Sequence, residues 1–345
     1  MTLKSLIINI KWRLSKIFLS ENQRLWRNVK KCNDDFRKGC IIPLEAYSTT
    51  APAKNNERKR AVCIYDGKIK NGGLADRLRG IVSVYEVCKE QNLDFKILFT
   101  SPFNLSEFLV PNKVDWRINE DELNYNTNIA ALCYIDTLTG SEYEAKKQRE
   151  WFCKEFKKKH IEFHVRTNAI FSYNGDFSTL FNELFKPSPR LRSSIEKQKA
   201  QLETDYISTS FRFMNLLGDF NETFELHNKI TKKEQSELIT RNIEQLRLLH
   251  DKYPSKRILV NSDSTTFLQT AAKLDYVYVI PGNVTHIDGK NNNNEYEAYE
   301  KTFLDFFMIA NAEKIFLMHT GQMYNSGYPF AASMIYNRHF EKIEF

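Results

Sequence analysis

The chain has 345 residues, about twice the size of a common domain, so two domains are expected. Hydrophobic residues make up 42% and charged residues 27%, as in an ordinary soluble globular protein. No stretch approaches the roughly 20 apolar residues of a membrane span. The net charge of +7 suits an anionic substrate or a membrane surface and is too small for a dedicated nucleic-acid binder.

Residues 1–19 have apolar side chains at helical spacing, interleaved with Lys and Arg. Two interpretations stay open: a helix that lies on an anionic membrane surface, and a helix that packs on the body of the protein. A secretion signal fits less well, because the apolar core from Leu6 to Ile10 is short and no small-residue cleavage site follows it. Residues 1–45 are interpreted as this basic helix and a connector.

The six cysteines form no C-x-x-C pair, and no Cys/His cluster has the spacing of zinc ligands. Cys63 and Cys88 lie in apolar runs and are expected to be small core residues. A reducing cytoplasm is the simplest setting for such a chain, with peripheral contact at the inner membrane face if residues 1–19 bind lipid.

The first half of the chain predicts an N-terminal Rossmann-like domain over residues 46–188. A short apolar strand is expected at 61–65, followed by a glycine turn, a helix at about 76–91 and a strand at 95–99, with further strands at 130–135 and 161–165. The order strand, glycine loop, helix, strand is typical of a parallel sheet. The glycine turn is not G-x-G-x-x-G, so it does not indicate a dinucleotide site.

A pattern break at residues 186–189 separates the halves, and Ser188 is expected to cap a helix at 189–202. Strands are then expected at 206–213, 257–263, 276–280 and 314–318, alternating with helices at 231–252, 264–273, 303–312 and 327–335. Residues 189–345 are therefore predicted to form a second Rossmann-like domain, and the fold class is α/β with two such domains facing across a cleft.

Two loops combine glycine, cation and carboxylate. In the first, Gly72 and Gly73 let the backbone turn and present amides to an anion, with Asp76 and Arg77 directly behind them. The alternative is an ordinary strand-to-helix turn, and the charges of Asp76 and Arg77 are what favour an anion site over it.

In the second loop, Arg212 follows an apolar strand, where a guanidinium is costly to bury unless it is paired. It is interpreted as a fork for a diphosphate, and the alternative is a salt bridge with Asp219 or Glu222.

Two further loops carry candidate donor contacts. Asp263 ends a strand and can accept hydrogen bonds from a base or ribose, or can cap the helix that follows it. The hydroxyl of Ser326 and the amide of Gly327 can close around phosphate, or Ser326 can simply cap the last helix. No Asp-x-Asp occurs, which disfavours a transfer that depends on Mg²⁺ or Mn²⁺, and no metal site is predicted.

Taken together, these residues resemble the GT-B fucosyltransferase superfamily, which includes the α1,2-, α1,6- and protein O-fucosyltransferases and the nodulation fucosyltransferase. Residues 72–77 resemble its Gly-Gly-Leu-Gly-Asn-Gln loop, with Asp76 in place of Asn. Residues 210–212 resemble its His-x-Arg motif, with Ser210 in place of His. Residues 258–263 and 305–331 resemble the strand that ends in Asp and the closing motif.

The resemblance implies an inverting, metal-independent transfer of a sugar, with fucose from GDP-fucose as the expected donor and no cofactor. The C-terminal domain would bind the donor and the N-terminal domain a saccharide or lipid-linked saccharide acceptor in surface polysaccharide synthesis. Catalysis would involve the cation Arg212 and a carboxylate base, with Asp219 preferred, Glu222 also placed shortly after the motif, and Asp76 as second choice. Donor contacts would come from the following residues: Gly72, Gly73, Arg77, Ser210, Asp263, Ser326 and Gly327.

Two alternatives stay open. One is a GT-B transferase that uses a different nucleotide sugar or moves a non-sugar group. The other is a non-catalytic protein of the same fold that binds saccharide or membrane.

Overall fold

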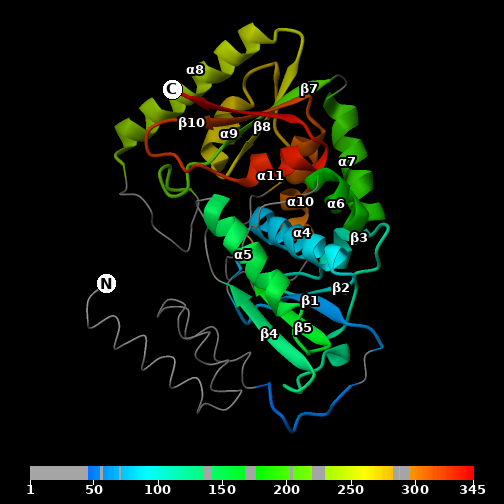
Figure 1. Cartoon of the computed structure of the whole chain (residues 1–345). Helices are drawn as coiled ribbons and strands as arrows, with labels where there is room; N and C mark the ends of the chain where they lie inside the picture. The colour runs from blue at the N-terminus through cyan, green and yellow to red at the C-terminus, as the bar shows by residue number, and fades with distance from the viewer. Residues whose placement is uncertain are drawn as a thin grey trace, which may run out of the picture. The chain divides into compact units, whose positions relative to one another are not determined.

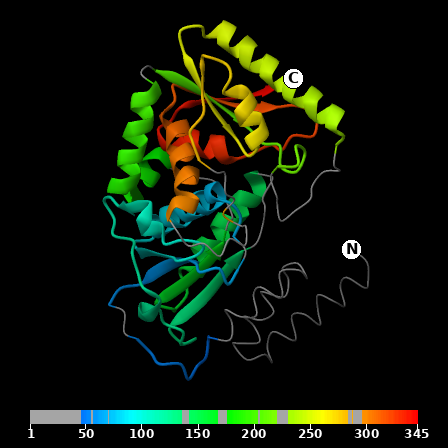
Figure 2. The same ribbon diagram turned by 180° about the vertical axis from the view of Figure 1, so that it is seen from behind.

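The computed structural model describes residues 46–345 apart from 55–56, 70, 136–141, 168–175, 203–204, 220–229, 283–286 and 288–295. The predicted basic helix at 1–19 and Glu222 therefore lie outside the described residues. The chain divides into two compact units (Figures 1 and 2). Unit 1 takes the chain up to Asn71 with Ser83–Phe99 and Trp116–Ser172, and unit 2 takes Gly72–Val82, Thr100–Asp115 and Tyr173–Phe345.

Unit 1 is built on a four-stranded parallel sheet in the order β2-β1-β5-β4. Its strands are β1 (Arg60–Tyr65), β2 (Asp94–Phe99), β4 (Ala130–Ile135) and β5 (Glu162–Thr167), and its helices are α5 (Glu142–Glu155), the short 3-10 turn η2 (Glu120–Glu122) and the second part of α4 (Leu74–Glu90). Cys63 and Cys88 are buried in this unit, as predicted. The odd-numbered residues of β1 and β5, among them Phe163, point toward the helices. This face of the sheet is therefore apolar.

Unit 2 has a five-stranded parallel sheet in the order β11-β10-β7-β8-β9. Its strands are β7 (Tyr206–Phe211), β8 (Arg257–Ser262), β9 (Val277–Tyr278), β10 (Lys314–His319) and β11 (His339–Glu344). Its helices are α6 (Phe177–Leu184), α7 (Pro189–Leu202), α8 (Lys232–Lys252), α9 (Thr265–Ala271), α10 (Tyr296–Asn311) and α11 (Tyr328–Ile335). A 3-10 turn η1 (Leu105–Glu107) and a small antiparallel pair, β3 (Leu109–Pro111) with β6 (Phe185–Pro187), complete it.

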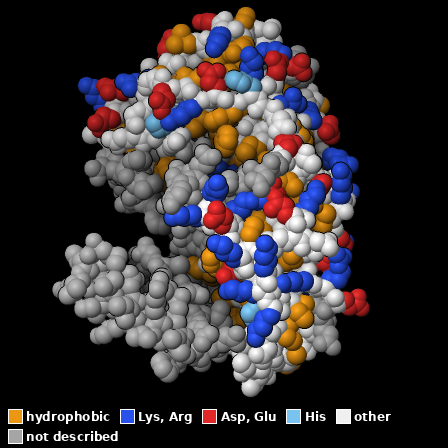
Figure 3. Space-filling view, in the orientation of Figure 1, with side chains coloured by type: hydrophobic (Ala, Val, Ile, Leu, Met, Phe, Trp, Pro, Cys, Tyr) orange, Lys and Arg blue, Asp and Glu red, His pale blue; other side chains and the backbone are white. Residues whose placement is uncertain are grey.

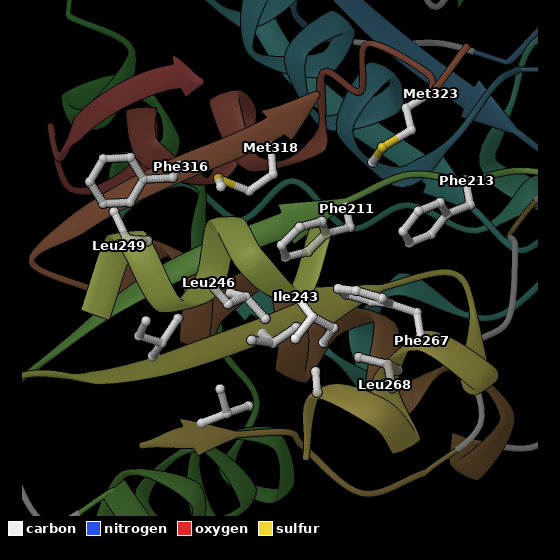
Figure 4. Close-up of a cluster of buried hydrophobic side chains, with 14 of the residues drawn as sticks. Phe211, Phe213, Ile243, Leu246, Leu249, Phe267, Leu268, Phe316, Met318 and Met323 are labelled. Carbon is white, nitrogen blue, oxygen red and sulfur yellow. The ribbon is translucent and has the colours of Figure 1, made fainter. Parts of the chain in front are cut away.

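Helices α8 and α9 cover one face of this sheet through a continuous apolar cluster (Figure 4). Phe211 of β7 packs against Phe267 of α9 with ring centroids 4.5 Å apart. Helix α8 starts where the sequence predicts, because Thr231 accepts the Glu234 amide and Glu234 reaches back to the Thr231 amide as a capping box. Helices α10 and α11 occupy the other face, so unit 2 is a three-layer α/β fold.

The predicted fold class, α/β with two parallel Rossmann-like sheets, is confirmed. Each expected strand and helix within the described residues is present, with shifts of a few residues at most ends; helix α10, expected at 303–312, begins earlier, at Tyr296. Helices α5 and α6 and the short strands β3 and β6 were not predicted from the sequence, and neither was strand β11. Its alternating polar sequence HFEKIE is half-exposed at a sheet edge, so it lacks the apolar run of a central strand.

Among the described helices, none is both long and apolar enough to cross a membrane. In the space-filling view, Lys and Arg side chains are interspersed with Asp and Glu over the face shown (Figure 3). Exposed lysines are most frequent on α5 and the turn after it, where Lys146, Lys147, Lys154 and residues 157–159 lie.

Candidate functional site

The order of strands in unit 2 marks a place for a ligand. The chain starts in the middle of the sheet with β7, continues to β8 and β9 on one side, and then returns to β10 and β11 on the other. The direction of winding therefore reverses between β7 and β10. In parallel sheets, ligands bind outside the carboxyl ends of the strands at such a reversal. The loops that follow β7 and β10 are the ones that flank this position.

Arg212 is the first residue after β7 and lies at this position. Its Nε is 3.3 Å from Oδ2 of Asp263, which follows the neighbouring strand β8. The Asp263 side chain is 1% exposed, whereas that of Arg212 keeps 18% of its surface. Among the described residues Asp263 pairs with Arg212, a partner that the sequence did not suggest, while Glu222 lies outside the described residues.

The environment shifts both groups away from the charged state. Burial raises the pKa of the Asp263 carboxyl above its usual range, even though Arg212 and two backbone amides favour the carboxylate. Burial also lowers the pKa of the Arg212 guanidinium, and the nearby Asp263 only partly compensates. Arg212 keeps part of its surface exposed at the carboxyl edge of the sheet, where parallel sheets bind ligands, so this position is a candidate anion site.

The loop after β10 contacts the same arginine. The amide of Tyr324 donates a hydrogen bond of 2.9 Å to the carbonyl oxygen of Arg212, which joins the two loops on either side of the winding reversal. Ser326 accepts the Tyr328 amide at 3.3 Å, but the N-cap of α11 is Gly327 and has no side-chain cap hydrogen bond, so the capping alternative for Ser326 was wrong. Whether Ser326 and Gly327 also contact a donor stays a prediction.

The glycine loop packs with unit 2, because Gly72–Val82 belongs to that unit. Gly72 has φ 70°, a backbone conformation that favours glycine. Arg77 is buried and donates from Nε to the Gly72 carbonyl at 2.9 Å and from Nη1 to the Ser101 carbonyl at 3.0 Å. Arg77 therefore fixes the shape of the turn that follows Gly72, and a donor contact from it stays a prediction.

Asp76 and Arg79 place a charged pair at the start of α11. Oδ1 of Asp76 is 2.7 Å from Nη2 of Arg79. A Cβ atom added to Gly327 would lie 3.1 Å from the same Nη2, so the guanidinium packs directly on the backbone of Gly327. The structure thus brings Asp76 and Gly327 together in unit 2, although they are 251 residues apart in the chain.

The remaining candidates occupy different surroundings. Asp219 is exposed, and its Oδ2 accepts hydrogen bonds from Oγ of Ser264 at 2.9 Å and from the Thr266 amide at 2.7 Å. It is thereby held against the residues that follow Asp263. Ser210 is 4% exposed, and its hydroxyl is buried without a hydrogen-bond partner within β7. In this conformation Ser210 lies beneath the surface, on the same face of the strand as Arg212.

A buried ion pair on α10 was not predicted from the sequence. Lys301 donates to Oδ1 of Asp305 at 2.9 Å and to the carbonyl of Ile280 at 3.0 Å, and each charged side chain is 7% exposed. Asp305 also accepts a hydrogen bond from Asn261 of β8. The signal was present, since opposite charges four residues apart interrupt an otherwise apolar helix.

No group of three His, Cys, Asp or Glu side chains arranged to hold a metal ion occurs among the described residues. His164, one of the histidines in the sequence, is buried in unit 1 between Tyr47 and Glu162, with ring nitrogens 2.5 Å from an oxygen of each.

No protein-family model and no curated protein matches the chain by sequence. Solved structures do match in fold. A NodZ α-1,6-fucosyltransferase soaked with GDP-fucose aligns with a TM-score of 0.54 at 12% identity, over 84% of this chain and 95% of that one. An arginine-to-lysine mutant of FUT1 from Arabidopsis thaliana in complex with GDP aligns with a TM-score of 0.54 at 11% identity, over 94% and 79%. Selenomethionine NodZ from Bradyrhizobium aligns with a TM-score of 0.52 at 11% identity, over 84% and 95%.

The fold is that of the GT-B fucosyltransferases. The likeness spans most of this chain.

Proposed function

We propose that this protein is an inverting, metal-independent glycosyltransferase that transfers fucose from GDP-fucose to a saccharide acceptor. The observation that carries the proposal is Arg212, a partly exposed guanidinium at the winding reversal of a sheet with the fucosyltransferase fold. Structures of that fold have been solved with GDP-fucose and with GDP, which supports this choice of donor.

Arg212 is proposed to bind the β-phosphate and to neutralise the charge that grows on the departing diphosphate. A cation already oriented in a partly buried site stabilises such a charge strongly, because little water screens it. The Gly72–Gly73 turn, Arg77, Ser210, Ser326 and Gly327 remain the proposed donor contacts.

A carboxylate is proposed to take the proton from the acceptor hydroxyl. Asp219 is the first choice because it is exposed and is held by Ser264 and Thr266 in a fixed place beside Asp263. Asp76 is the second choice, and in its favour is a side chain that is one-third exposed beside Arg79. Glu222 remains a candidate on sequence position alone.

The acceptor is proposed to be a saccharide or lipid-linked saccharide of surface polysaccharide synthesis. This part of the proposal rests on the resemblance of the motifs and on the basic amphipathic pattern of residues 1–19, which suits contact with an anionic membrane.

The test is a thermal-shift panel of GDP, UDP, ADP and CMP, each with and without EDTA. The proposal predicts that GDP raises the melting temperature most, by mass action on the folded state, and that EDTA leaves the shift unchanged. Selective stabilisation by UDP or ADP would replace GDP-fucose by another nucleotide sugar. Absence of stabilisation by every nucleotide would favour a non-catalytic binding protein.

A matched pair of variants ties the result to the site. Arg212→Ala is expected to lower the GDP shift strongly. Arg257→Ala, which removes an arginine at the amino end of β8 in the same sheet, is expected to keep it. Equal loss in both variants would contradict the placement of the site.

A further inference from the structure

Three contacts of Asp263 go to the segment that follows β7, and its Oδ1 also accepts from Oγ of the adjacent Ser262 at 3.5 Å. Its Oδ1 accepts the Phe213 amide at 2.9 Å, its Oδ2 accepts the Met214 amide at 2.7 Å, and Oδ2 also pairs with Nε of Arg212. One carboxylate therefore holds three consecutive residues, although it belongs to the neighbouring strand.

These contacts stabilise a turn that the backbone alone disfavours. Met214 has φ 55°, a left-handed conformation that is rare for a residue with a long side chain. An amide donated to a buried carboxylate compensates for this strain, because such charge-assisted hydrogen bonds are among the stronger ones in proteins. The direction of the chain after Arg212 thus depends on Asp263.

The pairing also fixes the arginine side chain. Nε of the guanidinium lies 3.3 Å from the carboxylate, and this ion pair restricts the orientations in which the guanidinium can meet a phosphate. The Asp263 side chain itself is 1% exposed, so it offers almost no surface to a base or ribose.

We propose that Asp263 is a positioning residue that orients Arg212 toward the β-phosphate of the donor, and that it does not read the nucleoside. This inference rests on the proposed function, and it replaces the donor contact assigned to Asp263 from the sequence. It predicts that Asp263 matters only for ligands that reach Arg212.

The test compares a nucleoside diphosphate with its monophosphate by calorimetry, using GDP and GMP on the full chain. In Asp263→Asn the affinity for GDP is expected to fall about 10-fold, the scale of one charge-assisted hydrogen bond, while the affinity for GMP stays within about 2-fold. A role in reading the nucleoside predicts instead an equal loss for both ligands, and that result would overturn the inference.

A double-mutant cycle gives a second readout. If Asp263 acts through Arg212, then Asp263→Asn has no further effect on GDP affinity in an Arg212→Ala background. Additive losses would mean that Asp263 touches the ligand independently of Arg212.

A third variant leaves Asp263 in place, in case its substitution prevents folding. Arg212→Lys keeps the positive charge but has no Nε to pair with the carboxylate. The inference predicts that Arg212→Lys loses most of the preference for GDP over GMP. A variant with Lys that binds GDP as tightly as the wild type would show that charge alone matters and would overturn it.

The outcomes separate this inference from the proposed function. If the wild type prefers UDP in the nucleotide panel, GDP-fucose is the wrong donor. The positioning role of Asp263 can then still be tested by comparing UDP with UMP. If the wild type binds GDP but the variants do not distinguish GDP from GMP, the inference fails and the proposed function stands. If the wild type binds no nucleotide, both fail.

Discussion

Each unit has a buried Asp–Arg pair at the carboxyl end of its sheet, and the two pairs are built differently. In unit 1, Arg166 at the end of β5 donates from both terminal nitrogens to both oxygens of Asp66, at 2.6 Å each, and the side chains are 2% and 5% exposed. In unit 2, Arg212 meets Asp263 through Nε at 3.3 Å, and Asp263 shares its oxygens with two backbone amides. The first pair is closed and bidentate, whereas the second holds a loop.

The pKa shifts of the two pairs have opposite directions. Burial opposes charge in both, but in unit 1 the hydrogen bonds and charge of the partner outweigh it, so the pKa of Asp66 is lowered and that of Arg166 is raised. In unit 2 burial prevails, so the pKa of Asp263 is raised and that of Arg212 is lowered. The surroundings of Asp66 and Arg166 therefore favour the charged forms, whereas the surroundings of Asp263 and Arg212 disfavour them.

The largest effect on the difference between the two ion pairs is expected from Arg212→Ala. We expect turnover, measured as GDP release from GDP-fucose, to fall roughly 10²–10³-fold, as when one preorganised donor to a developing anion is removed. Arg257→Ala is the control for a lost arginine in the same sheet. Unchanged turnover in Arg212→Ala would remove the functional difference between the two pairs.

Replacing the proposed base tests the acceptor side of the same site. Asp219→Asn is expected to lower turnover about 100-fold while GDP affinity stays near that of the wild type, because a general base acts on the acceptor hydroxyl. Asp76→Asn is the matched comparison. If the loss follows Asp76→Asn, the base belongs to the glycine loop.

Breaking the Asp66–Arg166 ion pair is expected to affect the stability of the fold only. Asp66→Ala leaves Arg166 buried without its partner and should cost about 3–5 kcal/mol of unfolding free energy, measured by denaturant titration. The double variant Asp66→Leu with Arg166→Met should recover much of that loss, since apolar groups of similar volume replace buried ion pairs well. A loss of GDP affinity in these variants, beyond that of the folded fraction, would contradict a purely structural role.

Acid should act on unit 1 through Glu162. Burial favours its neutral form, but His164, the Asn124 amide and Arg60 lower its pKa to about 2 in the folded state, below the 4.5 of the free acid. A lowered carboxyl pKa adds stability above the unfolded value, and this stability is lost as the pH falls through the folded value. Melting temperature should therefore decline between about pH 4.5 and pH 2. Glu162→Gln should flatten that decline, and an unaltered slope would exclude Glu162 as its source.

The smallest expected effect comes from Gly327→Ala. Its Cβ would lie 3.1 Å from Nη2 of Arg79, so the guanidinium must move by a few tenths of an ångström, and φ −79° is open to alanine. We expect a GDP affinity lowered a few-fold and little change in melting temperature. Arg79→Ala should remove this sensitivity. A large drop in stability would mean that the contact is rigid.

The sequence predicted the frame of unit 2 well because its strands are apolar runs and its helix starts carry recognisable caps. Ser188 accepts the Leu191 amide at 3.3 Å, and Thr231 forms the predicted box with Glu234. Such signals are local, so one stretch of chain contains all the information. The position of Arg212 at a strand end was predictable for the same reason.

The partners across strands were not predictable from one sequence. Asp263 and Arg212 are neighbours because β7 and β8 are adjacent, and the sequence offered Asp219 and Glu222 only because they are near in the chain. The packing of Gly72–Val82 with unit 2 and the contact of Arg79 with Gly327 depend on tertiary structure in the same way. Periodicity assigns elements, and it carries no information on which loops meet.

The hydrogen bonds and ion pair that Asp263 makes with the turn after β7 have an evolutionary consequence. A buried carboxylate that loses its cation costs several kcal/mol, and a left-handed residue at Met214 that loses its anchor adds to this. Substitutions at positions 212 and 263 should therefore occur together. A relative that has lost the arginine is expected to have lost the aspartate as well. Co-variation between these two columns in an alignment of relatives would be the record of that dependence.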